Sequence, residues 1–107
     1  NNEILTDLII PDDITIIKEY AFENCKTLQS IKIHSGVTEI NSYAFWFCSN
    51  LSNAYCYAIN PPKAYNVSFD YGAARLNFYV PATSIDSYKA ANGWCDSADY
   101  IFADTTM

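Results

Sequence analysis

The sequence has few positive charges and no long apolar run. Its 107 residues contain 6 Lys and Arg against 12 Asp and Glu, for a net charge of −6. Nucleic acids and anionic membranes are bound through clustered cations, so this shortage argues against both as partners. No apolar run approaches the roughly 18 residues that a membrane-spanning helix needs. We therefore expect no direct membrane insertion.

Charged residues are scarce overall, whereas apolar residues are plentiful. Charged side chains make up 17% of the chain, below the usual quarter, and half of the residues are hydrophobic. An intrinsically disordered chain has the opposite balance. A chain of this length is ordinary for one compact domain with a buried core.

The chain repeats itself at a fixed interval. Residues 5–27 align with residues 28–50 at eight identical positions, which share the pattern L-x-x-[L/I]-x-I, [I/V]-T-x-I and Y-A-F-x-x-C. Ordinary residue usage would give about one or two identities by chance. The matching positions are apolar side chains, Thr or Tyr, so the repeated feature is the core.

Each unit predicts two short strands and a turn. The first six residues suit a strand that buries its first, fourth and sixth side chains, and the second apolar pair suits a strand stub. The A-F-x-x-C segment has the spacing of one helical turn, with Phe and Cys pointing inward. Such a unit has one apolar face that must be covered by its neighbours, so the first strands should stack into a parallel ladder.

The repeat continues more weakly towards the C-terminus. We expect the last inward residues of four successive strands at spacings of 23, 23 and 24, namely at Ile10, Ile33, Cys56 and Val80. Two prolines in 60–63 and a glycine in 69–72 predict a longer surface loop on the convex side.

After Pro81 the periodicity stops, and the sequence predicts a cap. A helix begins after an N-cap at Thr83 or Ser84 and ends at a left-handed Asn92-Gly93. Trp94 is placed to plug the end of the stack, and residues 99–102 suit a final strand. The expected organisation is one domain over 1–107, with units 5–27 and 28–50, a degenerate unit 51–74, a last strand 75–81 and a cap 82–107.

The unit 28–50, with Val37-Thr38 and Tyr43-Ala44-Phe45-x-x-Cys48, resembles the BspA-like leucine-rich repeat of bacterial surface proteins. The stretch 79–94 is similar to the segment that closes such arrays. The resemblance implies an α/β leucine-rich repeat solenoid with a parallel β-ladder, short helical turns and a C-terminal capping helix. It also implies an extracellular or cell-surface location and adhesion to host or bacterial surface proteins or glycans. With two full units only, the chain is expected to be the C-terminal end of a longer protein.

Four cysteines raise the question of disulfides. Cys25 and Cys48 are repeat equivalents, so they should lie on adjacent coils within disulfide reach. The simpler interpretation is a ladder of buried thiols, because both occupy an apolar core position. Cys56 falls at an inward strand position and Cys95 lies in the cap. The sequence does not decide whether Cys25 and Cys48, or Cys56 and Cys95, form disulfides.

The sequence offers little for catalysis. The cysteines lack the C-x-x-C or Cys/His spacing of zinc sites, and no G-x-S-x-G motif is present. His34, the single histidine, follows a strand end, where we expect an exposed turn residue. Asp12-Asp13 aligns with Ser35-Gly36, which indicates a turn rather than paired catalytic carboxylates. We expect no enzyme activity, no cofactor and no metal.

The outer face of the ladder is the candidate binding site. Stacked strands bring the outward side chains within about 5 Å of each other, and tyrosine offers a large contact area at low entropic cost. The alternative is that β-propensity alone places tyrosines there. The candidate residues are Lys32, His34, Asn53, Tyr55, Tyr57 and Tyr79.

Two functions follow. The first is a cell-surface module that binds a protein or glycan through the ladder. The second is a structural cap or spacer of a longer solenoid with no ligand of its own. The strand at Leu5–Ile10 has no repeat in front of it, so its open edge also predicts self-association.

Overall fold

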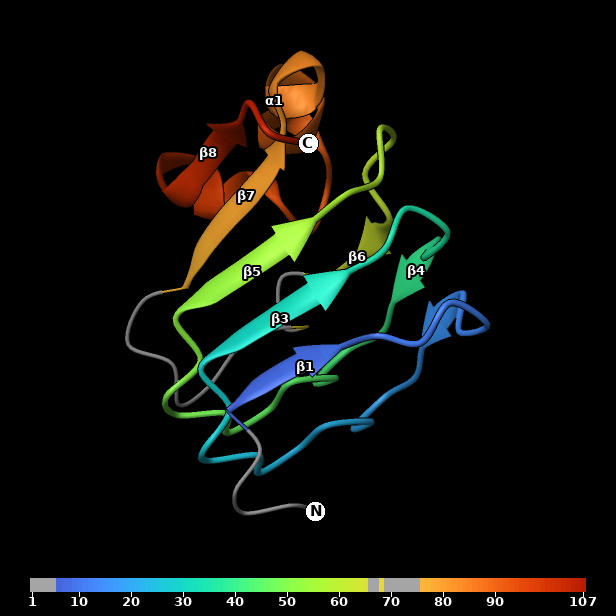
Figure 1. The fold of residues 1–107 in the computed structure, drawn as a ribbon, viewed down its shortest axis with the longest axis vertical. Helices are drawn as coiled ribbons and strands as arrows, with labels where there is room; N and C mark the ends of the chain where they lie inside the picture. The colour runs from blue at the N-terminus through green and yellow to red at the C-terminus, as the bar shows by residue number, and fades with distance from the viewer. Residues whose placement is uncertain (1–5, 66–67, 69–75) are drawn as a thin grey trace.

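Two parallel sheets form a coiled solenoid in the computed structural model, which describes residues 6–65, 68 and 76–107 (Figure 1). The larger sheet, called the ladder here, has the strand order β1-β3-β5-β7-β8. The smaller sheet has the order β2-β4-β6. The ladder strands are β1 (Asp7–Ile9), β3 (Ser30–Ile33), β5 (Asn53–Cys56), β7 (Asn77–Pro81) and β8 (Ile101–Asp104). The predicted α/β solenoid with a parallel ladder is confirmed.

The register of the ladder follows the repeat. Leu8 pairs with Ile31, Ile31 with Ala54, and Ala54 with Phe78, which are the steps that the sequence predicted. All four predicted last inward side chains are fully buried, so they lie on the core face of the ladder: Ile10, Ile33, Cys56 and Val80.

The smaller sheet consists of the predicted strand stubs and one that was not predicted. Its strands are β2 (Ile16–Ile17), β4 (Glu39–Ile40) and β6 (Lys63–Ala64). The prediction of a loop over 60–63 is wrong at its last residue, because Lys63 belongs to β6 and pairs with Glu39 of β4. The two prolines favour extended backbone, which leads directly into a strand. The second part of that predicted loop, 69–72, lies outside the described residues.

Tight turns replace the helical turn expected at A-F-x-x-C. The Ala44 amide donates to the Asn41 carbonyl and the Cys48 amide to the Phe45 carbonyl, each three residues back. Phe45 and Cys48 are buried as expected. The turns cannot join into a helix because left-handed residues interrupt them, with φ between 59° and 62° at Tyr20, Asn24, Tyr43 and Phe47.

The cap is a short helical segment followed by the last ladder strand. It contains η1 (Ala82–Ser84), α1 (Ile85–Ala90) and η2 (Cys95–Tyr100) ahead of β8. Gly93 is left-handed, with φ 83°, as predicted. Ser84, one of the two predicted N-cap residues, is the N-cap of α1, but its side chain makes no capping hydrogen bond. The Ser84 hydroxyl instead donates to the Ile59 carbonyl at 2.7 Å.

Three side chains of the cap hold the loop before β6. Besides Ser84, the Tyr88 hydroxyl donates to the Ala58 carbonyl at 2.7 Å, and Trp94 Nε1 donates to the Pro62 carbonyl at 2.9 Å. The Trp94 ring is 1% exposed and packs edge-on against Phe78 and Tyr88, with ring centroids 5.2 and 5.0 Å away. Trp94 thus closes the core at this end, as the sequence predicted.

Candidate functional site

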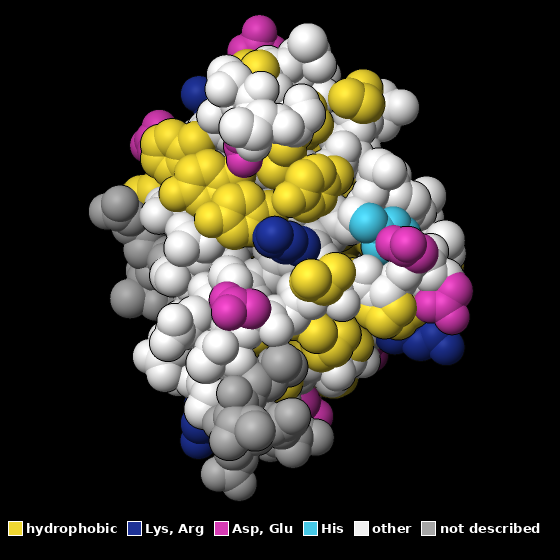
Figure 2. All heavy atoms as spheres, viewed as in Figure 1, with side chains coloured by type: hydrophobic (Ala, Val, Ile, Leu, Met, Phe, Trp, Pro, Cys, Tyr) yellow, Lys and Arg dark blue, Asp and Glu magenta, His cyan; other side chains and the backbone are white. Residues whose placement is uncertain are grey.

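The outer face of the ladder carries one row of large side chains. At one register position, each of the five ladder strands places one residue, and each of these residues pairs with the one on the neighbouring strand. This central row consists of Ile9, Lys32, Tyr55, Tyr79 and Phe102. Figure 2 shows this face, with hydrophobic side chains gathered over β5, β7 and β8 and a basic group beside them.

Three aromatic rings of the central row are in contact. The Tyr55 and Tyr79 rings stack with centroids 5.0 Å apart and planes 18° apart. The Phe102 ring continues the row at 5.8 Å from Tyr79. Parallel strands lie about 4.8 Å apart, which is the spacing that offset stacking of rings requires. The ladder thereby builds a continuous aromatic surface from residues far apart in sequence.

The central row is accessible to a partner along its whole length. Phe102 is 41% exposed and Ile9 is 69% exposed, while Tyr55 and Tyr79 are half-buried. Lys32 is also exposed and separates Ile9 from the rings. Large apolar side chains held on a regular strand face offer contact area without the entropy cost of ordering a flexible loop.

A polar row borders the central row. Asp7, Ser30, Asn53 and Asn77 occupy successive register positions on β1, β3, β5 and β7. The Ser30 hydroxyl donates to the Asp7 carboxylate. Asn53, a predicted site residue, is half-buried in this row. The apolar surface is thus bounded on one side by amide, hydroxyl and carboxylate groups.

His34 does not join the site. It is half-buried rather than exposed, and both ring nitrogens have hydrogen-bond partners, one in its own turn and one on the preceding coil. Nε2 lies 2.8 Å from the Ile14 carbonyl, and the Gly36 amide donates to Nδ1 at 3.0 Å. Because Nδ1 accepts, Nε2 carries the proton and donates to Ile14. His34 therefore connects the β3–β4 turn to the preceding coil.

Tyr57 lies beyond the end of β5, away from the stacked rings. It is half-buried, and its backbone amide donates to the Ile33 carbonyl at 3.0 Å. The structure thus brings Lys32, Tyr55 and Tyr79 together, places Asn53 beside them, and leaves His34 and Tyr57 at the rim.

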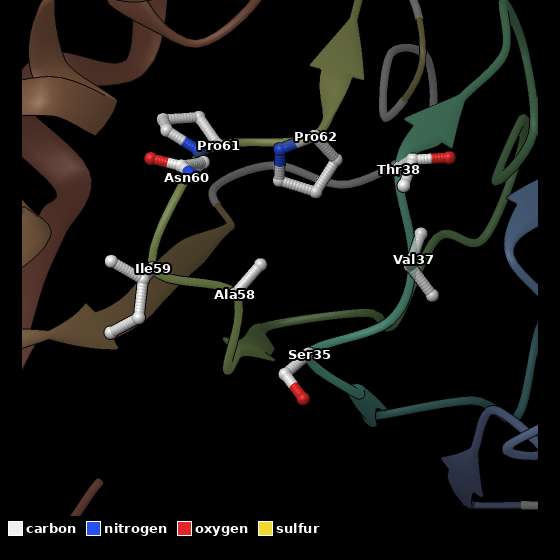
Figure 3. A pocket seen from close by; sticks show the side chains of 8 residues that line it. All are labelled: Ser35, Val37, Thr38, Ala58, Ile59, Asn60, Pro61 and Pro62. Carbon is white, nitrogen blue, oxygen red and sulfur yellow. The ribbon is translucent and has the colours of Figure 1, made fainter.

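A hollow of about 360 Å³ opens at this rim, between the turn after β3 and the loop after β5 (Figure 3). Residues 34–38 connect β3 to β4, whereas a slightly longer segment, residues 57–62, connects β5 to β6. The longer loop stands away from its neighbour, and the Ala58 methyl and Pro62 ring face the space between them. Among the residues that the structure describes, no charged side chain lines the hollow.

The thiols are the remaining reactive groups. Cys25, Cys48 and Cys56 are free, while the side chain of Cys95 is outside the described part of the chain. Burial raises the pKa of Cys48 to about 11 and also raises that of Cys56. Neither thiol has the lowered pKa of a catalytic nucleophile. Within residues 6–65, 68 and 76–107, no group of three His, Cys, Asp or Glu is arranged to hold a metal.

Sequence reasoning missed Phe102 as a member of the site. The final strand was placed at 99–102 and is found at 101–104. Phe102 lies one full repeat step after Tyr79, so the periodicity itself would have put it beside that ring. Ile9, which pairs with Lys32 at the other end of the central row, was not among the predicted site residues either.

The chain is similar to a known protein family. The family model described as "BspA type Leucine rich repeat region (6 copies)" matches residues 1–105. No curated protein matches the chain. Leucine-rich repeats generally act as non-catalytic modules that mediate protein–protein interactions, and those of the BspA type are typically found in surface proteins. In the described part of the chain, no helix has the length and hydropathy to cross a membrane.

Proposed function

Since the chain belongs to the BspA-type leucine-rich repeat family, we propose that it is an adhesion-type binding module that contacts its partner through the central row. The observation that carries this proposal is the contact of the Tyr55, Tyr79 and Phe102 rings on an accessible sheet face. The partner is a host or bacterial surface protein, and the location is extracellular or at the cell surface.

The composition of the central row supports a protein partner. Interface hot spots are rich in Trp, Tyr and Arg, and poor in Ser and Thr. Here three rings lie beside Lys32, with the polar row along one side. A protein surface with an apolar centre and an acidic group opposite Lys32 would match this arrangement. A glycan stacking on the rings is the alternative ligand.

A second function is favoured by the two ends of the solenoid. Trp94, Tyr88 and Ser84 close the core at the C-terminal end, whereas β1 has one described neighbour, β3. The chain would then close a longer solenoid and serve as a spacer without a ligand. The open edge of β1 is also the place for self-association. The division into a single domain with units 5–27, 28–50 and 51–74 stays a prediction.

The test is a binding screen of the domain against purified extracellular matrix proteins and a glycan panel, by biolayer interferometry. The variant Tyr55→Ala/Tyr79→Ala removes the stacked pair, and its binding should weaken at least about tenfold. Phe47→Asn is the matched control, because Phe47 is 41% exposed, off the ladder, and aligned with Asn24 in the same left-handed conformation. Equal binding by the double variant, with its fold checked by circular dichroism, would contradict the site. Absence of any binder would favour the second function, in which the chain closes a longer solenoid and has no ligand.

A further inference from the structure

The turns that carry Cys25 and Cys48 are joined directly across adjacent coils. The Phe22 amide donates to the Ala44 carbonyl and the Asn24 amide to the Trp46 carbonyl, both at 2.8 Å. The Phe22 and Phe45 rings stack in the same stretch, with centroids 5.3 Å apart and planes at 12°. These contacts hold the two turns side by side, immediately before each cysteine.

The Cys48 thiol faces the coil that carries Cys25 at this junction. The Cys48 thiol donates to the Phe22 carbonyl at 3.1 Å, so it reaches back to the preceding coil. Phe22 lies three residues before Cys25, on the turn that carries the Cys25 thiol. Adjacent coils are separated by about the spacing of paired strands, which falls within the Cα separation that a disulfide spans.

The surroundings make the two cysteines unequal. Cys25 is half-buried and reachable from solvent, whereas Cys48 is 1% exposed. Cys56 is fully buried beneath the ladder. A soluble oxidant can therefore meet Cys25 first, and the thiol beside it is Cys48.

We propose that Cys25 and Cys48 form a reversible disulfide between the two coils when the domain meets a small-molecule disulfide oxidant such as oxidised glutathione. The Cys25 thiolate attacks one sulfur of the oxidant, which forms a mixed disulfide and releases one glutathione thiolate. Cys48 then loses its proton to solvent and attacks the Cys25 sulfur. This second step forms the Cys25–Cys48 bond and releases the second glutathione.

The bond would act as a staple between neighbouring repeats. It joins equivalent positions of two successive units, and closing a loop one repeat long restricts the unfolded chain. An extracellular or cell-surface location, as proposed above, supplies the oxidising conditions in which such bonds persist. The inference itself does not depend on ligand binding, because its evidence is the junction between the two turns.

The experiment uses the whole chain, fully reduced and then incubated with oxidised glutathione. Peptide mapping by mass spectrometry should find Cys25 joined to Cys48, with the mass of two hydrogens lost and no glutathione retained. The thermal midpoint should rise and should fall again after treatment with a reductant. Cys56→Ala is the matched control and should keep the cross-link, whereas Cys25→Ala should abolish it.

Other outcomes would overturn the proposal. These are a stable glutathione adduct on Cys25 without an internal bond, a bond from either cysteine to Cys95, and two unmodified thiols after prolonged oxidation. Mapping is done on the native sequence, so a variant that fails to fold does not affect the result. A failed disulfide test would not affect the proposed binding role of the central row, because that role is tested by measuring affinity for a partner.

Discussion

The rings of Tyr55 and Tyr79 stack 5.0 Å apart because the register of β5 and β7 pairs these two residues directly. In the sequence, the pair is separated by one position more than the matching pairs of the first two repeats. The extra residue falls between the two strands, so it is absorbed in the connection and the row is preserved. The stacked aromatic row is thus a product of the repeat register rather than of any local motif.

Tyr79 should contribute to stability as well as to binding, because its ring contacts both Tyr55 and Phe102. Each aromatic pair is worth about 0.5–1.5 kcal/mol beyond its buried area. Tyr79→Ala should therefore lower the free energy of unfolding by about 1–3 kcal/mol, measured by urea titration. Tyr79→Phe keeps the ring and should lie within about 0.5 kcal/mol of the native chain, as mild surface substitutions do. Equal losses in the two variants would show that stacking is not the cause.

Trp94 should be among the most sensitive core positions. Its ring is 1% exposed, and Nε1 satisfies the Pro62 carbonyl. Trp94→Ala should cost about 3–5 kcal/mol, as large-to-small core changes do, and the cap should loosen in hydrogen exchange. Trp94→Phe keeps most of the packing but leaves the Pro62 carbonyl without its donor, at a cost of about 1–3 kcal/mol. A loss below about 1 kcal/mol for the alanine variant would contradict the closing role of Trp94.

Gly93 should resist substitution, because a side chain there meets the backbone of β6. A Cβ atom at Gly93 would lie 2.1 Å from the Ala64 carbonyl oxygen, and φ is already 83°. Gly93→Ala should therefore destabilise the domain by more than about 1 kcal/mol. Gly36→Ala is the control, since its Cβ meets the His34 side chain at 3.0 Å and no backbone. The two variants are compared by thermal unfolding, and a midpoint for Gly93→Ala at or above that of Gly36→Ala would be inconsistent with this account.

Stability should fall at alkaline pH. Burial raises the pKa of Cys48 from 9.0 to about 11, and the pKa values of Cys56 and Tyr88 are raised in the same direction. Above about pH 9 the unfolded chain loses protons that the folded chain keeps, so each pH unit favours unfolding further. For Cys48 the loss extends between about pH 9 and 11. Urea titrations at pH 7, 9 and 10.5 measure the decline, which should be shallower in Cys48→Ala, and a flat profile would refute it.

Much of the fold could be predicted from the sequence, because the repeat aligns core residues that must stack. Ile10, Ile33, Cys56 and Val80 are buried at the predicted spacings for this reason. The strand β6 was missed because Pro61 and Pro62 suggest a loop when read locally. Pairing with β4 overrides that local signal.

The other errors have a common cause in contacts between residues that are far apart in the sequence. The Phe-x-x-Cys spacing suits a helix, but the chain forms tight turns with left-handed residues instead. Hydrogen bonds to the next coil, such as the one from the Phe22 amide to the Ala44 carbonyl, hold these turns in place. The Ser84 side chain was expected to cap its own helix and instead binds Ile59 in a distant loop. His34 was expected in solvent and is held by Ile14 of the preceding coil. None of these partners can be read from neighbouring residues in the sequence.

The most direct test of the central claim is to map the contact surface on the domain itself. Isotope-labelled domain is titrated with a partner found in the binding screen, and the amide resonances are followed by nuclear magnetic resonance. The account predicts that the largest shifts fall on the central row, at Lys32, Tyr55, Tyr79 and Phe102. Shifts confined to the turns around Tyr20 and Phe47 or to the helices of the cap would contradict it.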